Sequence, residues 1–204
     1  NYNKILSELQ RNKIYPLLLS QVASAGRVNI VVTGNQTEIT KNIIETEIFG
    51  KPKTVHLALI GHGNVGGTLV EQILDSAYDI LKRKRVDLKI VAIANSKKIA
   101  FNKAGFGSDW RQKIKYSTTD SSVDSLVDFA KEHHLENLVM VDNTASKDFV
   151  KHYPTFVDNG FDIVGSNKIY NTLPISEYRN FRKLLEKNKK KYLYETNVGA
   201  GLPL

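Results

Sequence analysis

The stretch LALIGHGNVGGTLVEQI, residues 57–73, most constrains what this chain can fold into. An apolar run over 54–60 predicts a buried strand, and apolar residues recur at helical steps after the glycines. Between them, Gly61, Gly63 and Gly66 have G-x-G-x-x-G spacing. In this context the spacing favours a dinucleotide site, with a tight turn, close approach of a pyrophosphate and tight helix packing at the three glycines in order. A purely structural turn is the alternative.

The rest of the chain from residue 53 repeats the same alternation of apolar strands and helical periodicity. The predicted strands are 54–60, 87–94, 137–142, 161–166 and 191–196, and the helices are 65–80, 123–134, 147–160 and 175–185. We expect the third helix to be interrupted near Pro154, and a loop around Trp110. Such alternation predicts an α/β fold with a doubly wound parallel sheet, whose ligands gather at the carboxyl ends of the strands.

Residues 1–50 have a different pattern. The segment 15–26 reads as a helix, 27–34 as a strand ending in a glycine turn, and 37–49 as an amphipathic helix. These elements are few for a separate stable core. We therefore expect the tail of a preceding domain, followed by the short linker GKPK at 50–53.

Composition narrows the classes of function. The chain has no cysteine, which excludes disulfides, thiolate metal sites and a cysteine nucleophile within it and fits a reducing, cytoplasmic location. No apolar run approaches the roughly 20 residues of a membrane span, and the polar start NYNKILSELQRNK is unlike a signal peptide. The net charge of +8 raises the question of nucleic acid. The basic clusters at 81–89 and 186–192 lie where helices are expected to end, so we favour solvated helix ends over a nucleic-acid surface.

The end of the second strand bears on the choice of cofactor. An acidic residue there commonly binds the ribose 2′-hydroxyl of NAD, but this chain has Ala94, Asn95 and Ser96, followed by Lys97 and Lys98. Two lysines without a carboxylate permit a 2′-phosphate, so NADP is at least as plausible as NAD. Alternatively, the lysines only decorate a loop.

Two further side chains are candidates. His62 lies inside the glycine loop, where it either lines the cofactor or faces solvent, and we favour solvent. Lys168 follows the strand 161–166 and is therefore expected at the carboxyl edge of the sheet, where a lysine can bind a carbonyl oxygen or transfer protons. An ordinary surface lysine is the alternative.

Several ordered stretches together resemble homoserine dehydrogenase, specifically the dehydrogenase half of the bifunctional aspartokinase–homoserine dehydrogenases. They are LIGHGNVGGTLVEQI, VAIANSK, VDNTAS, VGSNKIYN and LYETNVGAGLPL, within residues 53–204. The resemblance implies a Rossmann-like NAD(P)-binding domain over 53–204. It also implies that residues 1–50 end an α+β, ACT-like regulatory region.

The family reduces L-aspartate 4-semialdehyde to L-homoserine with NADPH or NADH, on the route to threonine and methionine. By this resemblance the cofactor contacts are the Gly61–Gly66 loop, with Asn64 and Val65 in particular, together with Ala94 and Thr144. Lys168 corresponds to the family lysine set between the nicotinamide and the substrate, in a cofactor-binding and catalytic role.

The family also binds a monovalent cation, usually sodium, at the turn that is ETNVGAGL here. The resemblance assigns it the carboxylate of Glu195 and the backbone carbonyls of Val198, Ala200 and Leu202. Oxygen ligands suit a hard cation.

The chain stops at Leu204, where the family continues into its substrate and dimerisation domain. We therefore expect a truncated piece of an enzyme, inactive alone, whose parent is a homo-oligomer acting on a small molecule without nucleic-acid or membrane partners. Phosphorylating aldehyde dehydrogenases share such a cofactor fold but need a cysteine. A non-catalytic NAD(P)-sensing regulatory module is the remaining alternative.

Overall fold

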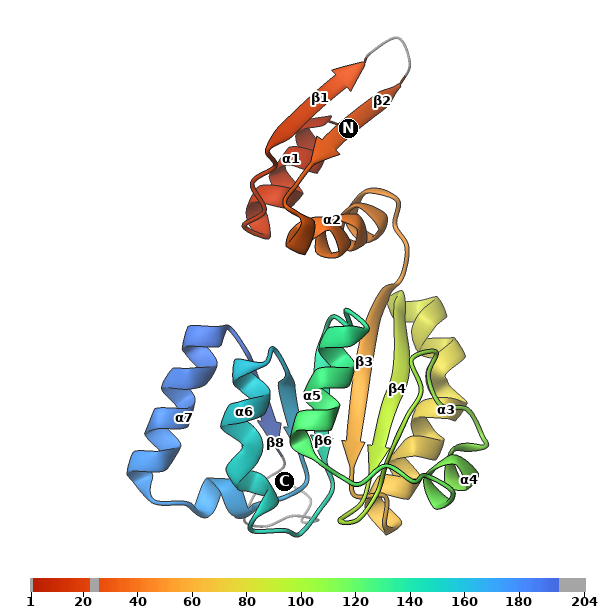
Figure 1. Cartoon of the computed structure of the whole chain (residues 1–204), viewed down its shortest axis with the longest axis vertical. Helices are drawn as coiled ribbons and strands as arrows, with labels where there is room; N and C mark the ends of the chain where they lie inside the picture. The colour runs from red at the N-terminus through yellow and green to blue at the C-terminus, as the bar shows by residue number, and fades with distance from the viewer. Residues whose placement is uncertain (1, 23–25, 195–204) are drawn as a thin grey trace. The chain divides into compact units, whose positions relative to one another are not determined.

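The computed structural model describes residues 2–22 and 26–194, and these form two compact units, residues 1–53 and 54–204. Figure 1 shows the elements of both units in chain order. In the part of the chain described, no helix combines the length and the apolarity that crossing a membrane requires.

The first unit pairs a two-stranded antiparallel sheet with helices. Its elements are α1 (Tyr2–Arg11), β1 (Leu18–Val22), β2 (Arg27–Val31), a 3₁₀ turn (Gly34–Gln36), α2 (Thr37–Ile43) and a π-helical turn (Ile44–Ile48). A small cluster of Ile5, Leu9, Ile14 and Ile43 is buried within it.

The helix expected over 15–26 is wrong, because β1 occupies this segment. Leucine, glutamine and alanine favour a helix locally. However, β1 pairs with β2 in a register that sets Leu18 opposite Val31 and Val22 opposite Arg27. Strand pairing with a neighbouring segment outweighs the weak local preference.

The second unit is a six-stranded sheet in the order β5-β4-β3-β6-β7-β8. Its elements are β3 (Lys53–Ile60), α3 (Asn64–Lys84), β4 (Val86–Ala94), β5 (Ile99–Phe101), α4 (Trp110–Lys115), α5 (Val123–Glu132), β6 (Leu138–Asp142), a 3₁₀ turn (Phe149–His152), α6 (Tyr153–Asp158), β7 (Asp162–Gly165), a 3₁₀ turn (Ile169–Thr172), α7 (Ile175–Asn188) and β8 (Tyr192–Tyr194). β3, β6, β7 and β8 pair in parallel, which confirms the doubly wound sheet.

Helices cover both faces of this sheet. Leu57 and Leu59 pack with residues of α3 and α4, whereas Ala58 and Ile60 pack with residues of α5, α6 and α7. In Figure 1 the last three helices lie together on one face. Burial on both faces explains why β3 reads as a continuous apolar run.

The segment expected to be a loop around Trp110 contains two short elements instead. β5 pairs antiparallel with β4 at one edge of the sheet, and Trp110 is the first residue of α4 and is buried. Three strand residues and six helix residues are too short for a clear period. The interruption near Pro154 is confirmed, because a 3₁₀ turn precedes α6 and the proline lies in the first turn of α6.

Candidate functional site

The carboxyl edge of the sheet, where β3, β4, β6 and β7 end, contains a topological switch point. From β3 the chain passes through α3 to β4 on one side, while β6 and β7 lie on the other. The register sets Ile60 opposite Asp142, and Asp142 opposite Gly165. The loops that follow these strands therefore lie beside one another, and such a crevice is the usual ligand site of an open α/β sheet.

Gly61 joins the glycine loop to both neighbouring strand ends. Its N–H donates to the carbonyl of Ala94 over 2.8 Å, and its φ of +84° favours glycine. A Cβ at this position would lie 3.0 Å from backbone atoms of Asn143 and 3.0 Å from Cγ2 of Thr144. The loop thus contacts the ends of both β4 and β6.

The other two glycines of the motif have different surroundings. A Cβ on Gly66 would lie 1.8 Å from the carbonyl oxygen of Gly61, so no larger residue fits there. Gly63 is the N-cap residue of α3, and a Cβ there would meet nothing within 4 Å. Gly63 has no side chain to cap the 21-residue helix, so it leaves the first N–H groups of α3 without a side-chain partner at this position. This cradle fits a pyrophosphate group.

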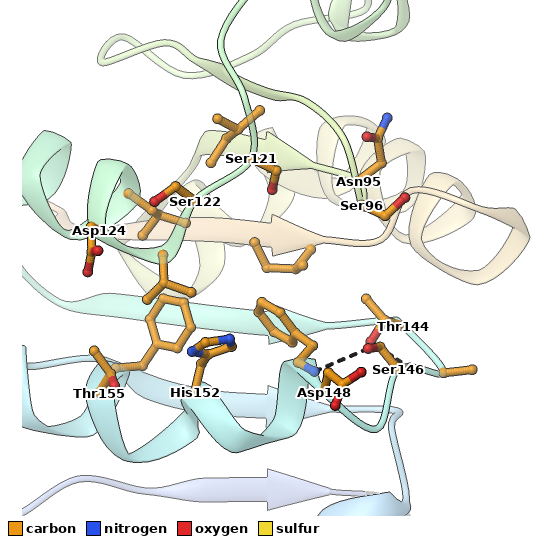
Figure 2. Close-up of a pocket in the computed structure, with 17 residues that line it drawn as sticks. Asn95, Ser96, Ser121, Ser122, Asp124, Thr144, Ser146, Asp148, His152 and Thr155 are labelled. Carbon is orange, nitrogen blue, oxygen red and sulfur yellow. Dashed lines mark hydrogen bonds between the residues drawn. The ribbon is translucent and has the colours of Figure 1, made fainter.

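A cavity of about 620 Å³, the α5–α6 cavity, opens from the same edge (Figure 2). Polar residues line it near the strand ends, among them Asn95 and Ser96 after β4 and Thr144 and Ser146 after β6. Its lining also includes apolar residues, namely Ile60, Ile99, Val123, Leu126, Phe149 and Phe156. Ten of the 17 lining residues are polar, so the cavity combines apolar surface with many hydrogen-bonding groups, a mixture that suits a base attached to a sugar.

A second hollow of about 370 Å³, the His62 hollow, lies on the other side of Asn95. It is lined by His62, Asn95, Trp110, Arg111, Ile114 and Lys115. His62 is half-buried, with its ring centroid 5.9 Å from that of Trp110 and its Nε2 3.1 Å from Nδ2 of Asn95, and the preference for a solvent-facing side chain stays a prediction. The guanidinium of Arg111 lies over Trp110 and pairs with Glu71.

Lys97 and Lys98 differ in their surroundings. Oδ1 of Asn95 accepts the backbone N–H groups of both lysines over 2.8 Å, which fixes the turn after β4. The ammonium of Lys98 bonds the carboxylate of Asp120 over 2.7 Å and the carbonyl of Thr118 over 3.1 Å. The side chain of Lys97 is exposed.

Lys168 is half-buried after β7, next to the loop that carries Thr144. The preceding residue, Asn167, donates from Nδ2 to Oγ1 of Thr144 over 3.3 Å. The structure therefore brings the glycine loop, Ala94, Thr144 and Lys168 to one edge of the sheet. Asn64 and Val65 form the first turn of α3 there, and the side chain of Val65 is exposed.

The buried polar network that lies below this edge was not predicted from the sequence. Asp142, the last residue of β6, accepts hydrogen bonds from Tyr153 and Asn167, and all three are buried. Burial raises the pKa of the Tyr153 hydroxyl, and the adjacent Asp142 carboxylate raises it further. The signal in the sequence that could have indicated this network is the aspartate that ends an otherwise apolar strand.

The expected cation ligands Glu195, Val198, Ala200 and Leu202 lie outside the described residues.

Comparisons with known proteins agree with this geometry. The family model for the NAD binding domain of homoserine dehydrogenase matches residues 61–195. A bifunctional aspartokinase/homoserine dehydrogenase of Buchnera aphidicola is 38% identical over 99% of this chain and 25% of its own length. The chain thus spans about a quarter of the length of the curated relatives it matches.

Two solved structures share the fold. Homoserine dehydrogenase from Thermoplasma acidophilum superposes with a TM-score of 0.57 at 22% identity, covering 74% of this chain and 46% of the other. A hyperthermophilic archaeal homoserine dehydrogenase in complex with NADPH superposes with a TM-score of 0.55 at 20% identity, with the same coverage of 74% and 46%.

Proposed function

This chain belongs to the homoserine dehydrogenase family and carries its NAD-binding domain, and from that premise we propose that it is the cofactor-binding part of an enzyme that interconverts L-homoserine and L-aspartate 4-semialdehyde. The observation that carries the proposal is the open cradle at Gly63, which adjoins the first turn of a long helix at the switch point of the sheet. We further propose that the parent enzyme also contains an aspartokinase, as the printed names of its relatives indicate.

In this proposal each part of the carboxyl edge binds one part of the cofactor. The N–H groups at the start of α3 bind the pyrophosphate, and Gly66 keeps the loop close to the helix. The α5–α6 cavity, bordered by Asn95 and Thr144, takes the adenosine. The loop after β7, with Lys168, then lies on the side of the nicotinamide.

We propose that the cofactor is NADP rather than NAD. The His62 hollow lies directly beside Asn95, where the ribose 2′ position is expected, and it contains the cations Arg111 and Lys115. A guanidinium suits a phosphate, because its fork of N–H donors matches the phosphate oxygens. Lys97 adds an exposed positive charge to the same turn.

The bound cofactor supplies hydride exchange between C4 of the nicotinamide and the aldehyde carbon of the substrate. The task of this chain is to hold the two partners and to stabilise charge. The ammonium of Lys168 is the group we assign to the carbonyl oxygen, where it stabilises the negative charge that develops as the aldehyde is reduced. We also propose, from the sequence, a sodium ion bound by Glu195, Val198, Ala200 and Leu202. Three further proposals from the sequence are an ACT-like character of residues 1–50, a cytoplasmic location and a homo-oligomeric parent.

The proposal is tested with Lys168→Ala in the complete enzyme, followed through the absorbance of NADPH with aspartate semialdehyde as substrate. We expect kcat to fall on the order of 100-fold, the usual effect of removing one charge-stabilising group, with little change in NADPH affinity. A kcat that survives the substitution removes Lys168 from the chemistry. A complete protein that binds NADPH but reduces no aldehyde is instead a nucleotide-sensing module.

A further inference from the structure

Asp142 is a fully buried carboxylate beneath the cofactor edge. Its side chain is 0% exposed, and it ends β6 between the loop of Thr144 and the loop after β7. Oδ1 accepts the backbone N–H of Thr144 over 2.7 Å, and Oδ2 accepts the hydroxyl of Tyr153 over 2.8 Å and Nδ2 of Asn167 over 3.1 Å. One carboxylate therefore contacts both loops and α6.

Asn167 forms the second link between the two loops. Its side chain is 3% exposed, and Nδ2 also lies 3.3 Å from Oγ1 of Thr144 and 3.1 Å from the carbonyl oxygen of Ser146. Its Oδ1 accepts the N–H of Ile169 over 3.1 Å. The residues on either side of Lys168 are thereby fixed relative to Thr144.

The backbone adds further bonds between the same loops. The carbonyl oxygen of Asp142 accepts the N–H of Ser166 over 2.9 Å and lies 3.4 Å from its hydroxyl. Gly165 leaves room for this arrangement, because a Cβ there would lie 3.3 Å from the hydroxyl of Tyr153. The strand end, the tyrosine and the glycine fit together around one buried carboxylate.

A buried carboxylate is costly unless hydrogen bonds satisfy it, and well-packed apolar side chains often stabilise a fold at least as well. A carboxylate at this buried position therefore points to a requirement other than stability. We infer that Asp142 is a positioning residue, which holds Thr144 and the loop of Lys168 in the single arrangement that binds the cofactor. This inference rests on the function proposed above.

Asp142→Asn is the sharpest test, since it keeps the size of the side chain but leaves only one acceptor oxygen. If that oxygen faces Thr144, the new NH₂ opposes the NH₂ of Asn167. If it faces Asn167, the new NH₂ opposes the N–H of Thr144. Either way one loop loses its bond, and we expect NADPH affinity of the 204-residue chain to fall about tenfold or more, as for an unsatisfied buried donor.

Tyr153→Phe is the matched control. It removes the one donor to Asp142 that comes from α6 rather than from a loop, so it lowers the melting temperature while NADPH affinity stays at the wild-type value. Loss of affinity in Asp142→Asn alone supports the inference. Equal affinity in the two variants, whether kept or lost, overturns it.

Two further measurements keep the test decisive. If Asp142→Asn does not fold, Asn167→Ala replaces it, because this change removes the side-chain link of Asn167 between the loops and leaves the bonds of Thr144 and Tyr153 to Asp142 in place. Its loss of affinity supports the inference, and wild-type affinity overturns it. If wild-type protein binds no NADPH, the proposed function fails, while hydrogen exchange still decides on positioning. The amides of Thr144 and Ile169 should then exchange faster in Asp142→Asn than in Tyr153→Phe, and equal exchange overturns the inference.

Discussion

At the scale of single residues, Gly63 and Gly66 belong to one spacing motif but have opposite surroundings. The φ of Gly63 is −66° and a Cβ there meets open space, whereas a Cβ on Gly66 would overlap the carbonyl oxygen of Gly61. The two positions therefore serve different purposes. Gly66 is required for the fold of the loop. In the proposal, Gly63 is required because it leaves space for the pyrophosphate of the cofactor.

This contrast predicts how alanine is tolerated at the two positions. Gly66→Ala should lower the free energy of unfolding by about 1–3 kcal/mol or more, the usual cost of overpacking. Gly63→Ala should cost less, at most about 1 kcal/mol, because alanine meets no neighbouring atom there and is only a poorer N-cap residue than glycine. Urea denaturation of both variants measures the difference. Equal losses would mean that the open space at Gly63 is not present in solution.

The cations around Asn95 predict the preference between the two nicotinamide cofactors. Arg111→Ala and Lys97→Glu should each weaken NADPH binding, with about a tenfold loss for Arg111, the scale of a charged hydrogen bond, and leave NADH binding almost unchanged. Lys131→Glu makes the same charge change as Lys97→Glu, but in the last turn of α5, away from this edge, and is its control. If NADPH and NADH lose affinity equally in Arg111→Ala, the His62 hollow binds no 2′-phosphate.

At the scale of elements, α6, β8 and the 3₁₀ turn Ile169–Thr172 meet through buried tyrosines. Tyr170 stacks on Tyr153 with ring centroids 5.0 Å apart and meets Tyr192 edge-on at 6.0 Å. Burial, together with the charge of Glu177, raises the pKa of Tyr170 to about 12. Burial also raises the pKa values of Tyr153 and Tyr192. All three hydroxyls thus stay protonated in the fold after they would ionise in the unfolded chain.

A raised pKa in the folded state has a definite consequence for stability. The contribution is complete below the unfolded pKa near 10 and is lost as the pH rises through the folded value. For Tyr170 the loss falls between about pH 10 and pH 12 and amounts to about 1–3 kcal/mol. Unfolding free energies at pH 9 and pH 11.5 should therefore differ more in wild type than in Tyr170→Phe. Parallel pH curves for the two proteins would contradict this account.

Elements with a long, clear period were predictable from the sequence, and those formed by partners were not. The run 54–60 and the 21-residue α3 follow from apolar patterning alone. β1 depends on pairing with β2, and β5 on pairing with β4. At the site, spacing located the glycine loop, and the place of Lys168 after the strand predicted over 161–166 put it at the same edge. The bonds of Asp142 and the ring contact between His62 and Trp110 join segments far apart in the chain and required the structure.

At the scale of the whole molecule, the residues proposed for the cofactor, from Gly61 to Lys168, lie in the second compact unit, residues 54–204. Residues 1–53 form the other unit and contribute none of them. The chain spans about a quarter of the length of its curated relatives, and its own task in the proposal is to bind the cofactor.

The central claim is that the glycine loop at the carboxyl edge binds NAD(P), and calorimetric titration of NADPH into the 204-residue chain tests it most directly. Wild type should bind one NADPH per chain. Gly63→Val should fold, because its side chain enters open space, and should lose at least tenfold in affinity, or about 1.4 kcal/mol, because it occupies the path of the pyrophosphate. A wild-type chain that binds no NADPH, or a folded Gly63→Val that binds it as tightly as wild type, would contradict the claim.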